Sequence, residues 1–166
     1  MTDDGATRDA VVIERSLDAP VDVIWLMWTD PEHFKKWYGP DGATIPVATM
    51  DVRVGGSRLL GMELRTPNGV MHRWFAGEYL EVVENERLVY TESMSMSGES
   101  EPSRSGEGLP DGHAGVTEVL VELEDLGGRT RMVMTHAGVP GDSPGAVGWT
   151  MALDKLVAHV AARATP

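Results

Sequence analysis

The stretch Asp30-Pro-Glu-His-Phe-Lys-Lys-Trp-Tyr-Gly-Pro40 decides the fold of this chain. Its first proline favours the opening position of a short helix, where the missing backbone N–H removes no hydrogen bond. Thr29 or Asp30 is placed to cap that helix, because either side chain can accept a hydrogen bond from the first turn. Phe34 and Trp37 give the helix a buried edge, and the closing Gly-Pro pair ends it.

A strand and another helix are predicted before this stretch. Residues 11–17, Val-Val-Ile-Glu-Arg-Ser-Leu, are rich in the β-branched side chains that are typical of strands. The turn Asp18-Ala-Pro20 then leads into a helix with proline in its first turn. The apolar side chains of this helix recur at helical spacing and form one stripe, made of Val21, Ile24, Trp25 and Trp28.

After the stretch, short turns separate segments in which polar and apolar residues alternate. The turn signals include Gly55-Gly56, Pro67-Asn-Gly69 and Asp125-Leu-Gly-Gly128. Strands joined by turns this short are expected to pair antiparallel. The expected strands cover residues 44–53, 57–65, 70–83, 88–96, 116–124 and 130–137.

The last segment reads as a long amphipathic helix that Ser143-Pro144 caps. Its apolar residues fall at i, i+4, i+7 and i+11, which places them on one face. That face must be buried against the sheet. The predicted stripe consists of Trp149, Leu153, Leu156 and Val160.

These elements predict an α+β fold. An antiparallel sheet of about six to seven strands packs against a long C-terminal helix, and two short helices follow the first strand. The 166 residues suggest a single domain over residues 1–166. Residues 1–9 are predicted to be a disordered tail. Residues 97–115 are rich in glycine, serine, proline and acids, and are predicted to be a flexible polar loop, either a lid, a partner site or merely disordered.

Composition excludes several classes of site and partner. There are 26 acidic and 14 basic residues, a net charge of −12, which disfavours nucleic acids and anionic membranes. The chain has no cysteine, and its five histidines show no metal-ligand spacing, so no metal site is expected. No phosphate-binding glycine loop is present, and no cofactor is expected. The acidic N-terminus is unlike a signal peptide, which predicts a cytoplasmic protein.

Further motifs lie in order along the chain: Ala19-Pro-Val-Asp-Val-Ile-Trp25, Asp51-Val-Arg-Val-Gly-Gly56, Glu86-Arg-Leu-Val-Tyr-Thr91 and Gly148-Trp149. With the opening stretch, they resemble the START-like SRPBCC superfamily from about residue 11 to 160. Within it, the chain is most similar to the branch named for the activator of the ninety-kilodalton heat-shock protein ATPase, of the C-terminal-domain type. The resemblance implies a helix-grip fold, in which a curved antiparallel sheet wraps around the C-terminal helix, with a pocket between the sheet and this helix.

Strand alternation predicts which side chains face that pocket. Residues 70–83 are ambiguous, because Trp74 and Leu80 fall on one face while Met71, Phe75 and Tyr79 fall on the other. The interpretation adopted here places Trp74 inside. The full predicted lining is Trp37, Arg58, Leu60, Met62, Trp74, Tyr90, Glu92, Met94, Met132, Met134, His136, Trp149 and Leu153.

Three polar residues, Arg58, Glu92 and His136, fall on the inward faces. A buried charge is costly unless it is paired, so they either pair with one another or meet a polar group of a ligand. The alternative is that they lie solvated at the sheet edge or pocket mouth. If they converge, Arg58 is a candidate to hold an anionic or carbonyl group, and His136 and Glu92 are candidates for proton transfer.

Three functions remain open from the sequence. We expect the binding of a small apolar or amphipathic molecule, such as a lipid or a polyketide-like compound, because the inward set is rich in methionine and tryptophan. One alternative is an enzyme of cyclase, dehydratase or hydrolase type that uses the three polar residues. The other is a chaperone-associated or stress-response protein, implied by the family name alone. A homodimer is possible, but no residue pattern indicates its interface.

Overall fold

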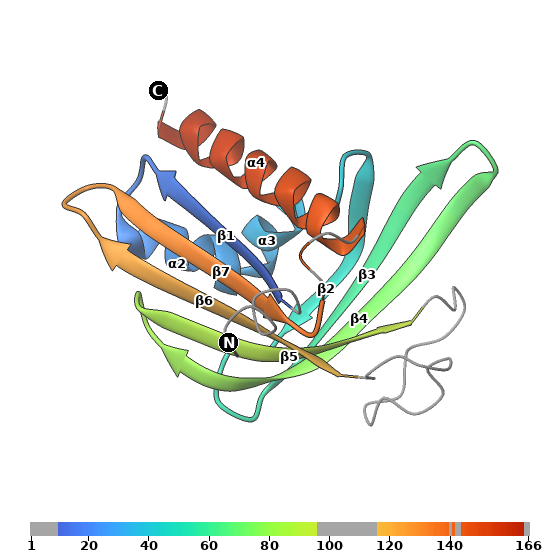
Figure 1. Ribbon diagram of the computed structural model, residues 1–166, viewed down its shortest axis with the longest axis horizontal. Coiled ribbons are helices and arrows are strands. Elements are labelled where there is room, and N and C mark those ends of the chain that lie inside the picture. The colour runs from blue at the N-terminus through green and yellow to red at the C-terminus, as the bar shows by residue number, and fades with distance from the viewer. Residues whose placement is uncertain (1–9, 96–115, 140, 142–143, 165–166) are drawn as a thin grey trace, which may run out of the picture.

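A computed structural model describes residues 10–95, 116–139, 141 and 144–164. The expected tail, polar loop, strand end at Met96 and Ser143 cap lie outside these residues. The elements in chain order are β1 (Ala10–Leu17), α2 (Val21–Thr29), α3 (Pro31–Trp37), β2 (Ala43–Met50), β3 (Ser57–Thr66), β4 (Gly69–Val83), β5 (Arg87–Ser95), β6 (Thr117–Asp125), β7 (Thr130–Ala137) and α4 (Pro144–Ala164) (Figure 1).

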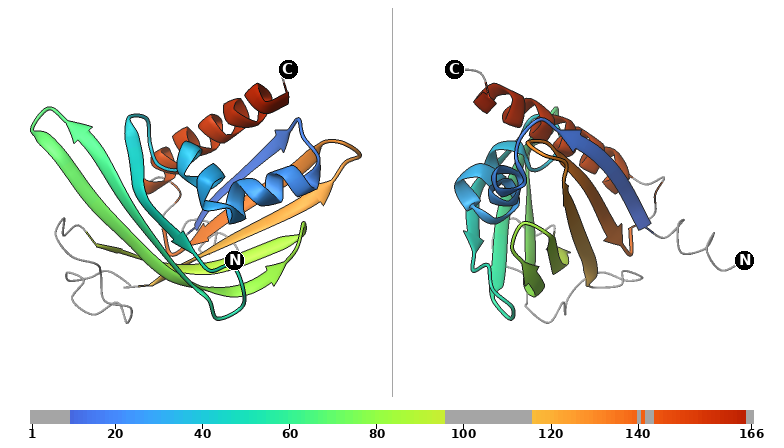
Figure 2. Two further views of the ribbon diagram at one scale, coloured as in Figure 1. Left: turned by 180° about the vertical axis from the view of Figure 1, so that it is seen from behind. Right: turned by 90° about the vertical axis from the view of Figure 1, so that its left-hand side faces the viewer.

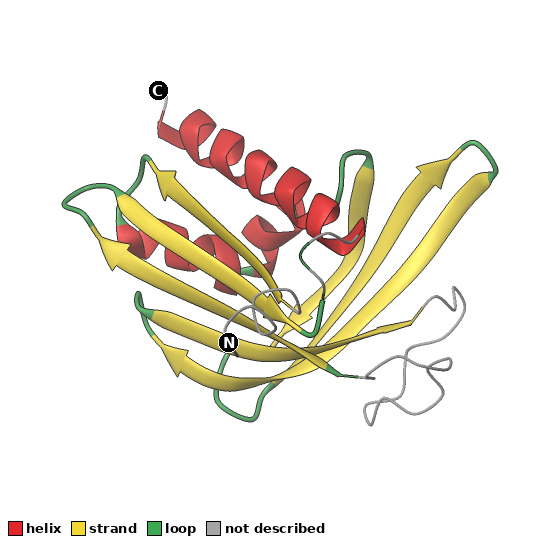
Figure 3. Ribbon diagram, viewed as in Figure 1, coloured by secondary structure: helices red, strands yellow, loops and turns green. Residues whose placement is uncertain are grey.

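The seven strands form one antiparallel sheet in the order β1-β7-β6-β5-β4-β3-β2. The sheet is strongly curved, and all three helices lie on its concave side (Figures 2 and 3). Seen end-on in the right panel of Figure 2, the strands form a trough and α4 runs along its open side. The predicted helix-grip architecture is therefore confirmed.

The opening stretch folds as its sequence predicts. Asp30 is the cap of α3, because its carboxylate accepts a hydrogen bond of 2.9 Å from the backbone N–H of Glu32. Thr29 does not cap it, since its hydroxyl donates to the carbonyl of Trp25 one turn back in α2. Trp37 is fully buried, and its indole N–H donates to the carbonyl of Met27. That hydrogen bond links α3 to α2 and holds the Trp37 ring in the core on the concave side.

The face of β4 that points inward is set by its register with β3. Phe75 pairs with Leu60 and is 8% exposed, whereas Trp74 pairs with Gly61. Leu60 is fully buried in the core, so Phe75 lies inside and Trp74 lies on the convex face. Placing Trp74 in the lining was therefore wrong. Both faces of this strand carry aromatic residues, so alternation alone does not distinguish them. On the convex face the indole packs so close to Gly61 that a Cβ there would lie 3.0 Å from the ring.

A β-bulge bends β4 near its end. Tyr79 pairs with Tyr90 and Glu81 with Val89, so Leu80 is one extra residue relative to β5. Leu80 is 42% exposed, while Tyr79 is fully buried. The bulge keeps the inward face continuous across the bend.

Two further sequence predictions, the end of β2 and the buried stripe of α4, can be compared with the structure. β2 ends at Met50, short of the expected residue 53, because residues 51–56 form the turn itself. Within that turn Gly55 has a φ of +85°, which a glycine adopts without strain. The stripe predicted for α4 is confirmed: Trp149, Leu153, Leu156 and Val160 are all buried. Within the described part of the chain, no helix is long and apolar enough to cross a membrane.

Candidate functional site

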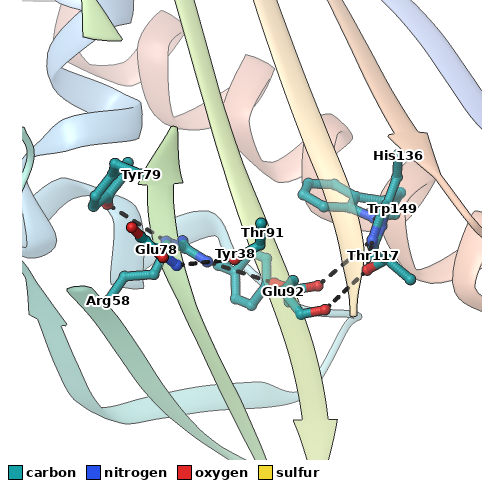
Figure 4. Close-up of polar contacts among 9 residues, drawn as sticks. All are labelled: Tyr38, Arg58, Glu78, Tyr79, Thr91, Glu92, Thr117, His136 and Trp149. Carbon is teal, nitrogen blue, oxygen red and sulfur yellow. Dashed lines mark hydrogen bonds and ion pairs between the residues drawn. The ribbon is translucent and has the colours of Figure 1, made fainter. Parts of the chain in front are cut away.

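Polar side chains form a line across the concave face. Neighbouring strands from β3 to β7 contribute one member each, and Trp149 of α4 closes the line from the helix side (Figure 4). We call this set the polar line; its members are Arg58, Tyr79, Glu92, Thr117, His136 and Trp149. It brings together the three polar residues whose convergence the sequence left open, and they lie buried rather than at a solvated edge.

Glu92 is the centre of the polar line. It is 5% exposed, and one carboxylate oxygen accepts a hydrogen bond of 3.2 Å from the Tyr38 hydroxyl. The same oxygen lies 3.5 Å from Nη1 of Arg58, while the other lies 3.8 Å from Nε2 of His136. Burial and the nearby carboxylate raise the pKa of Tyr38 well above its ordinary value, so this tyrosine stays a neutral donor.

Arg58 forms one end of the polar line and is incompletely satisfied. Its guanidinium Cζ lies 3.7 Å from the centre of the Tyr90 ring, and its Nε donates to the Tyr79 hydroxyl at 3.4 Å. Within the described residues, Nη1 and Nη2 of Arg58 have no hydrogen-bond acceptor, and the Tyr90 hydroxyl has no hydrogen-bond partner. The Arg58 side chain is nonetheless completely buried.

The charge of Arg58 survives this burial. Burial disfavours the charged form, but the tyrosine hydroxyls and Glu92 outweigh it, and the pKa of Arg58 stands above its ordinary value. Burial also raises the pKa of Tyr90 far above its ordinary value. This end of the line is therefore a permanent cation beside a neutral hydroxyl, both with unused donor capacity.

The His136 end, by contrast, is closed. The Trp149 indole can only donate, so its 2.9 Å contact makes Nδ1 of His136 an acceptor. The ring proton then sits on Nε2, which donates to the Thr117 hydroxyl at 2.7 Å. Thr117 in turn donates to the backbone carbonyl of Glu92 at 3.1 Å. Both nitrogens of His136 and the Thr117 hydroxyl therefore have hydrogen-bond partners.

The same geometry keeps His136 neutral. Burial lowers its pKa, Arg58 lowers it further, and Glu92 opposes them. A second proton would have to sit on Nδ1, where it would face the N–H of Trp149. Both ring nitrogens are thus occupied, and neither offers a lone pair to a substrate proton. This arrangement does not favour the proton transfer considered for His136.

The remaining predicted lining residues divide into two groups. Most lie in the buried core between sheet and helices: Trp37, Leu60, Met62, Tyr90, Met132, Met134, Trp149 and Leu153. Met94 faces the same side, opposite Phe75, but is 38% exposed. Of the predicted set, Trp74 alone lies on the convex face.

Sequence reasoning missed Tyr38, Tyr79 and Thr117. Tyr79 was assigned to the face opposite Trp74, so the correct choice for that strand would have included it. Thr117 stands at the start of β6, two residues before the buried Val119, and strand alternation was a usable signal. Tyr38 follows the last residue of α3, where no periodicity predicts a side-chain direction.

The chemistry available here is recognition by hydrogen bonding and charge. Among the residues that the structure describes, no group of three or more histidines and acids is placed to hold a metal ion. The unused donors gather at Arg58 and Tyr90, so the arrangement fits an acceptor such as a carbonyl or carboxylate oxygen.

Comparisons with known proteins agree with this architecture. The chain is similar to a crystal structure of a protein from Chromobacterium violaceum, with 26% identity, a TM-score of 0.71, and coverage of 92% of this chain and 96% of that chain. A Nitrosomonas europaea protein shares 23% identity, with a TM-score of 0.72 and coverage of 94% and 96%. The AHSA1 protein from Silicibacter pomeroyi shares 18% identity, with a TM-score of 0.69 and coverage of 93% and 99%.

No curated protein matches the chain. The sequence model of one family, described as Activator of Hsp90 ATPase homolog 1-like protein, matches residues 18–161. That match spans most of the 166 residues and agrees with the resemblance drawn from the opening stretch. The chain therefore belongs to the family of Activator of Hsp90 ATPase homolog 1-like proteins.

Proposed function

We propose that this protein binds a small apolar or amphipathic molecule on the concave face of the sheet, with an acceptor group of that molecule against Arg58 and Tyr90. The observation that carries the proposal is the unused donor capacity at the Arg58 end of the polar line. A buried donor without a partner costs about 1–3 kcal/mol, and more when it is charged. An acceptor supplied by a ligand removes that cost.

The surroundings of these donors favour an apolar ligand body. Leu60, Met62 and Phe75 lie on the inward face beside Arg58, and all three are buried hydrophobic residues. Methionine is flexible and polarizable, so it adapts to apolar partners of different shape. An apolar surface with a few polar anchors is the usual form of a small-molecule site. A lipid or polyketide-like molecule with a carbonyl or carboxylate group fits this description.

Two measurements test the proposal. The first compares native and denaturing mass spectra of the protein purified from its own host; we expect a small mass that is lost on denaturation. The second titrates dodecanoic acid into the protein by calorimetry. Tyr90→Phe should weaken binding about tenfold, the value of one hydrogen bond. Arg65→Met, which removes an exposed charge from the outward face of β3, is the matched control. Equal affinities for wild type, Tyr90→Phe and Arg65→Met would overturn the proposal.

The two alternative functions have weaker support. A reaction of cyclase, dehydratase or hydrolase type needs a base. Both nitrogens of His136 are engaged with Trp149 and Thr117, and the Glu92 carboxylate is engaged with Tyr38 and Arg58. A chaperone-associated role rests on the description of the family. A shared fold does not carry function from one member to another, so ligand binding remains the proposal.

A further inference from the structure

We infer that Arg73 is a second anchor on the same face, and that the ligand is bipolar: an apolar body with an acceptor group at each end. This inference rests on the proposed function. It adds that the group at the Arg73 end is anionic. The natural class is therefore a molecule such as a long-chain dicarboxylate or an acid with a distant carbonyl group.

Arg73 shares the inward face with Arg58. It pairs with Met62 across the β3–β4 register, and Met62 is 4% exposed and packs toward Gly39 on the concave side. Within β4, Arg73 is two residues from the inward Phe75, so the two residues lie on the same face. Its Nε is buried and has no hydrogen-bond partner among the described residues. Like Arg58, it therefore offers a donor that the described protein does not use.

The two arginines are separated by an apolar stretch. Gly77 lies opposite Arg58 and is four residues from Arg73 along β4, which corresponds to roughly 13 Å. The inward side chains between them, Leu60, Met62 and Phe75, carry no charge. A ligand that reaches both guanidinium groups must therefore have an apolar middle of comparable length.

The far half of the β3–β4 hairpin is less covered than the near half. Its inward residues Leu64, Met71 and Arg73 are only partly buried, and Met94 beside them is 38% exposed. Figure 1 shows the turn end of this hairpin extending beyond the N-terminal end of α4. A ligand anchored at Arg58 would pass from the covered part of the sheet toward this outer part.

Charge is distributed unequally between the two faces of β3, β4 and β5. Glu63, Glu78 and Glu81 point outward, whereas Glu92 is the inward acid of these three strands. Glu92 lies within 3.5 Å of Arg58, so it partly neutralises that end. No ion pair joins Arg73 to an acid in the described part of the chain. In a protein of net charge −12, this uncompensated inward cation favours an anionic group.

The experiment compares two probes of equal chain length, dodecanedioic acid and dodecanoic acid, by calorimetric titration. Wild-type protein should bind the dicarboxylate at least about tenfold more tightly, since it adds one charge-assisted hydrogen-bonded contact. Arg73→Met should abolish that preference, Arg73→Lys should restore much of it, and Arg65→Met should leave it unchanged. The thermal midpoint of each variant is measured first, and the titrations are run at a temperature at which wild type, Arg73→Lys and Arg73→Met are all fully folded.

The possible failures are distinguishable. If both probes bind wild-type protein equally, or if Arg73→Met keeps the preference, the second anchor is overturned while the proposed function stands. If neither probe binds wild-type protein, both the proposed function and this inference are overturned.

Discussion

The two ends of the polar line solve the same problem differently. Both place polar groups in a buried environment, where an unmatched donor is costly. At one end, His136 has a partner for each ring nitrogen, from Trp149 and Thr117. At the other end, Arg58 and Tyr90 retain donors without acceptors. The comparison teaches that burial alone does not distinguish the two ends; their unused hydrogen-bonding capacity does.

We call the His136 end of the polar line the closed end and the Arg58 end the open end. The closed end has a structural consequence that the open end lacks. Trp149 is on α4 and His136 is on β7, so their hydrogen bond fixes the start of the helix to the sheet. The Arg58 end instead engages Tyr79 and Glu92 of the sheet (Figure 4) together with Phe34 and Tyr38 from α3 and its C-terminal end. We therefore expect loss of the Thr117 hydroxyl at the closed end to lower stability, and loss of the Tyr90 hydroxyl at the open end to weaken ligand binding instead.

The largest effect is expected from Arg58→Met. It leaves the Glu92 carboxylate buried without its cation, which should lower the free energy of unfolding by about 3–5 kcal/mol. The double variant Arg58→Met/Glu92→Gln removes both charges and should recover most of that loss. Urea denaturation measures all three proteins. Arg65→Met is the control for simple loss of an arginine, and an equal effect from the two single arginine variants would contradict the assignment of a coupled pair.

Thr117→Val tests the closed end with almost no change of shape. It removes the acceptor of the His136 Nε2–H and the donor to the Glu92 carbonyl. An unmatched buried N–H costs about 1–3 kcal/mol, so the free energy of unfolding should fall by that amount. The measurement is again chemical denaturation, at pH 8. A loss below about 0.5 kcal/mol would mean that the chain of hydrogen bonds is not closed in solution.

The closed end should also respond to pH. Because the pKa of His136 is lowered in the folded protein, its contribution to stability is fully present above the unfolded value of 6.5. As the pH falls below that value, the unfolded state takes up the proton first and stability declines, by at most about 1.4 kcal/mol per pH unit. Unfolding curves between pH 8 and pH 5 measure this slope. In His136→Gln the slope over this range should be smaller; an unchanged slope would exclude His136 as its source.

The smallest effect is expected from Tyr90→Phe at the open end. Its hydroxyl has no hydrogen-bond partner within the described residues, and a phenyl ring preserves the stacking on Arg58. The free energy of unfolding without ligand should change by less than about 0.5 kcal/mol. Thr117→Val is the matched hydroxyl deletion, so the two variants compare the ends directly. A larger loss in Tyr90→Phe than in Thr117→Val would reverse the comparison.

Much of the fold could be predicted from the sequence because the local signals agree with the tertiary arrangement. The Asp30–Pro31 pair caps α3, and the alternating segments become the strands of the sheet. The inward positions of Arg58, Glu92 and His136 followed from the same alternation. These features depend only on residues near one another in sequence.

The rest depended on contacts between distant segments. Trp74 and Phe75 offer the same apolar character to opposite faces, and only pairing with Gly61 and Leu60 of β3 distinguishes them. The neutral state of His136 depends on Trp149, a side chain from a different element that approaches across the core. The donors left over at Arg58 could not be counted before its partners were known.

The bulge at Leu80 has a consequence for how the sheet of this fold can change its shape. Side chains alternate along a strand, so a shift of one residue exchanges the two faces. At Leu80 this does not apply: with that residue deleted, Tyr79 would still pair with Tyr90 and Glu81 with Val89, so Arg73 and Phe75 would stay inward. A codon lost at this bend would then change the curvature of the sheet in one evolutionary step, without exchanging the inward and outward residues of β4.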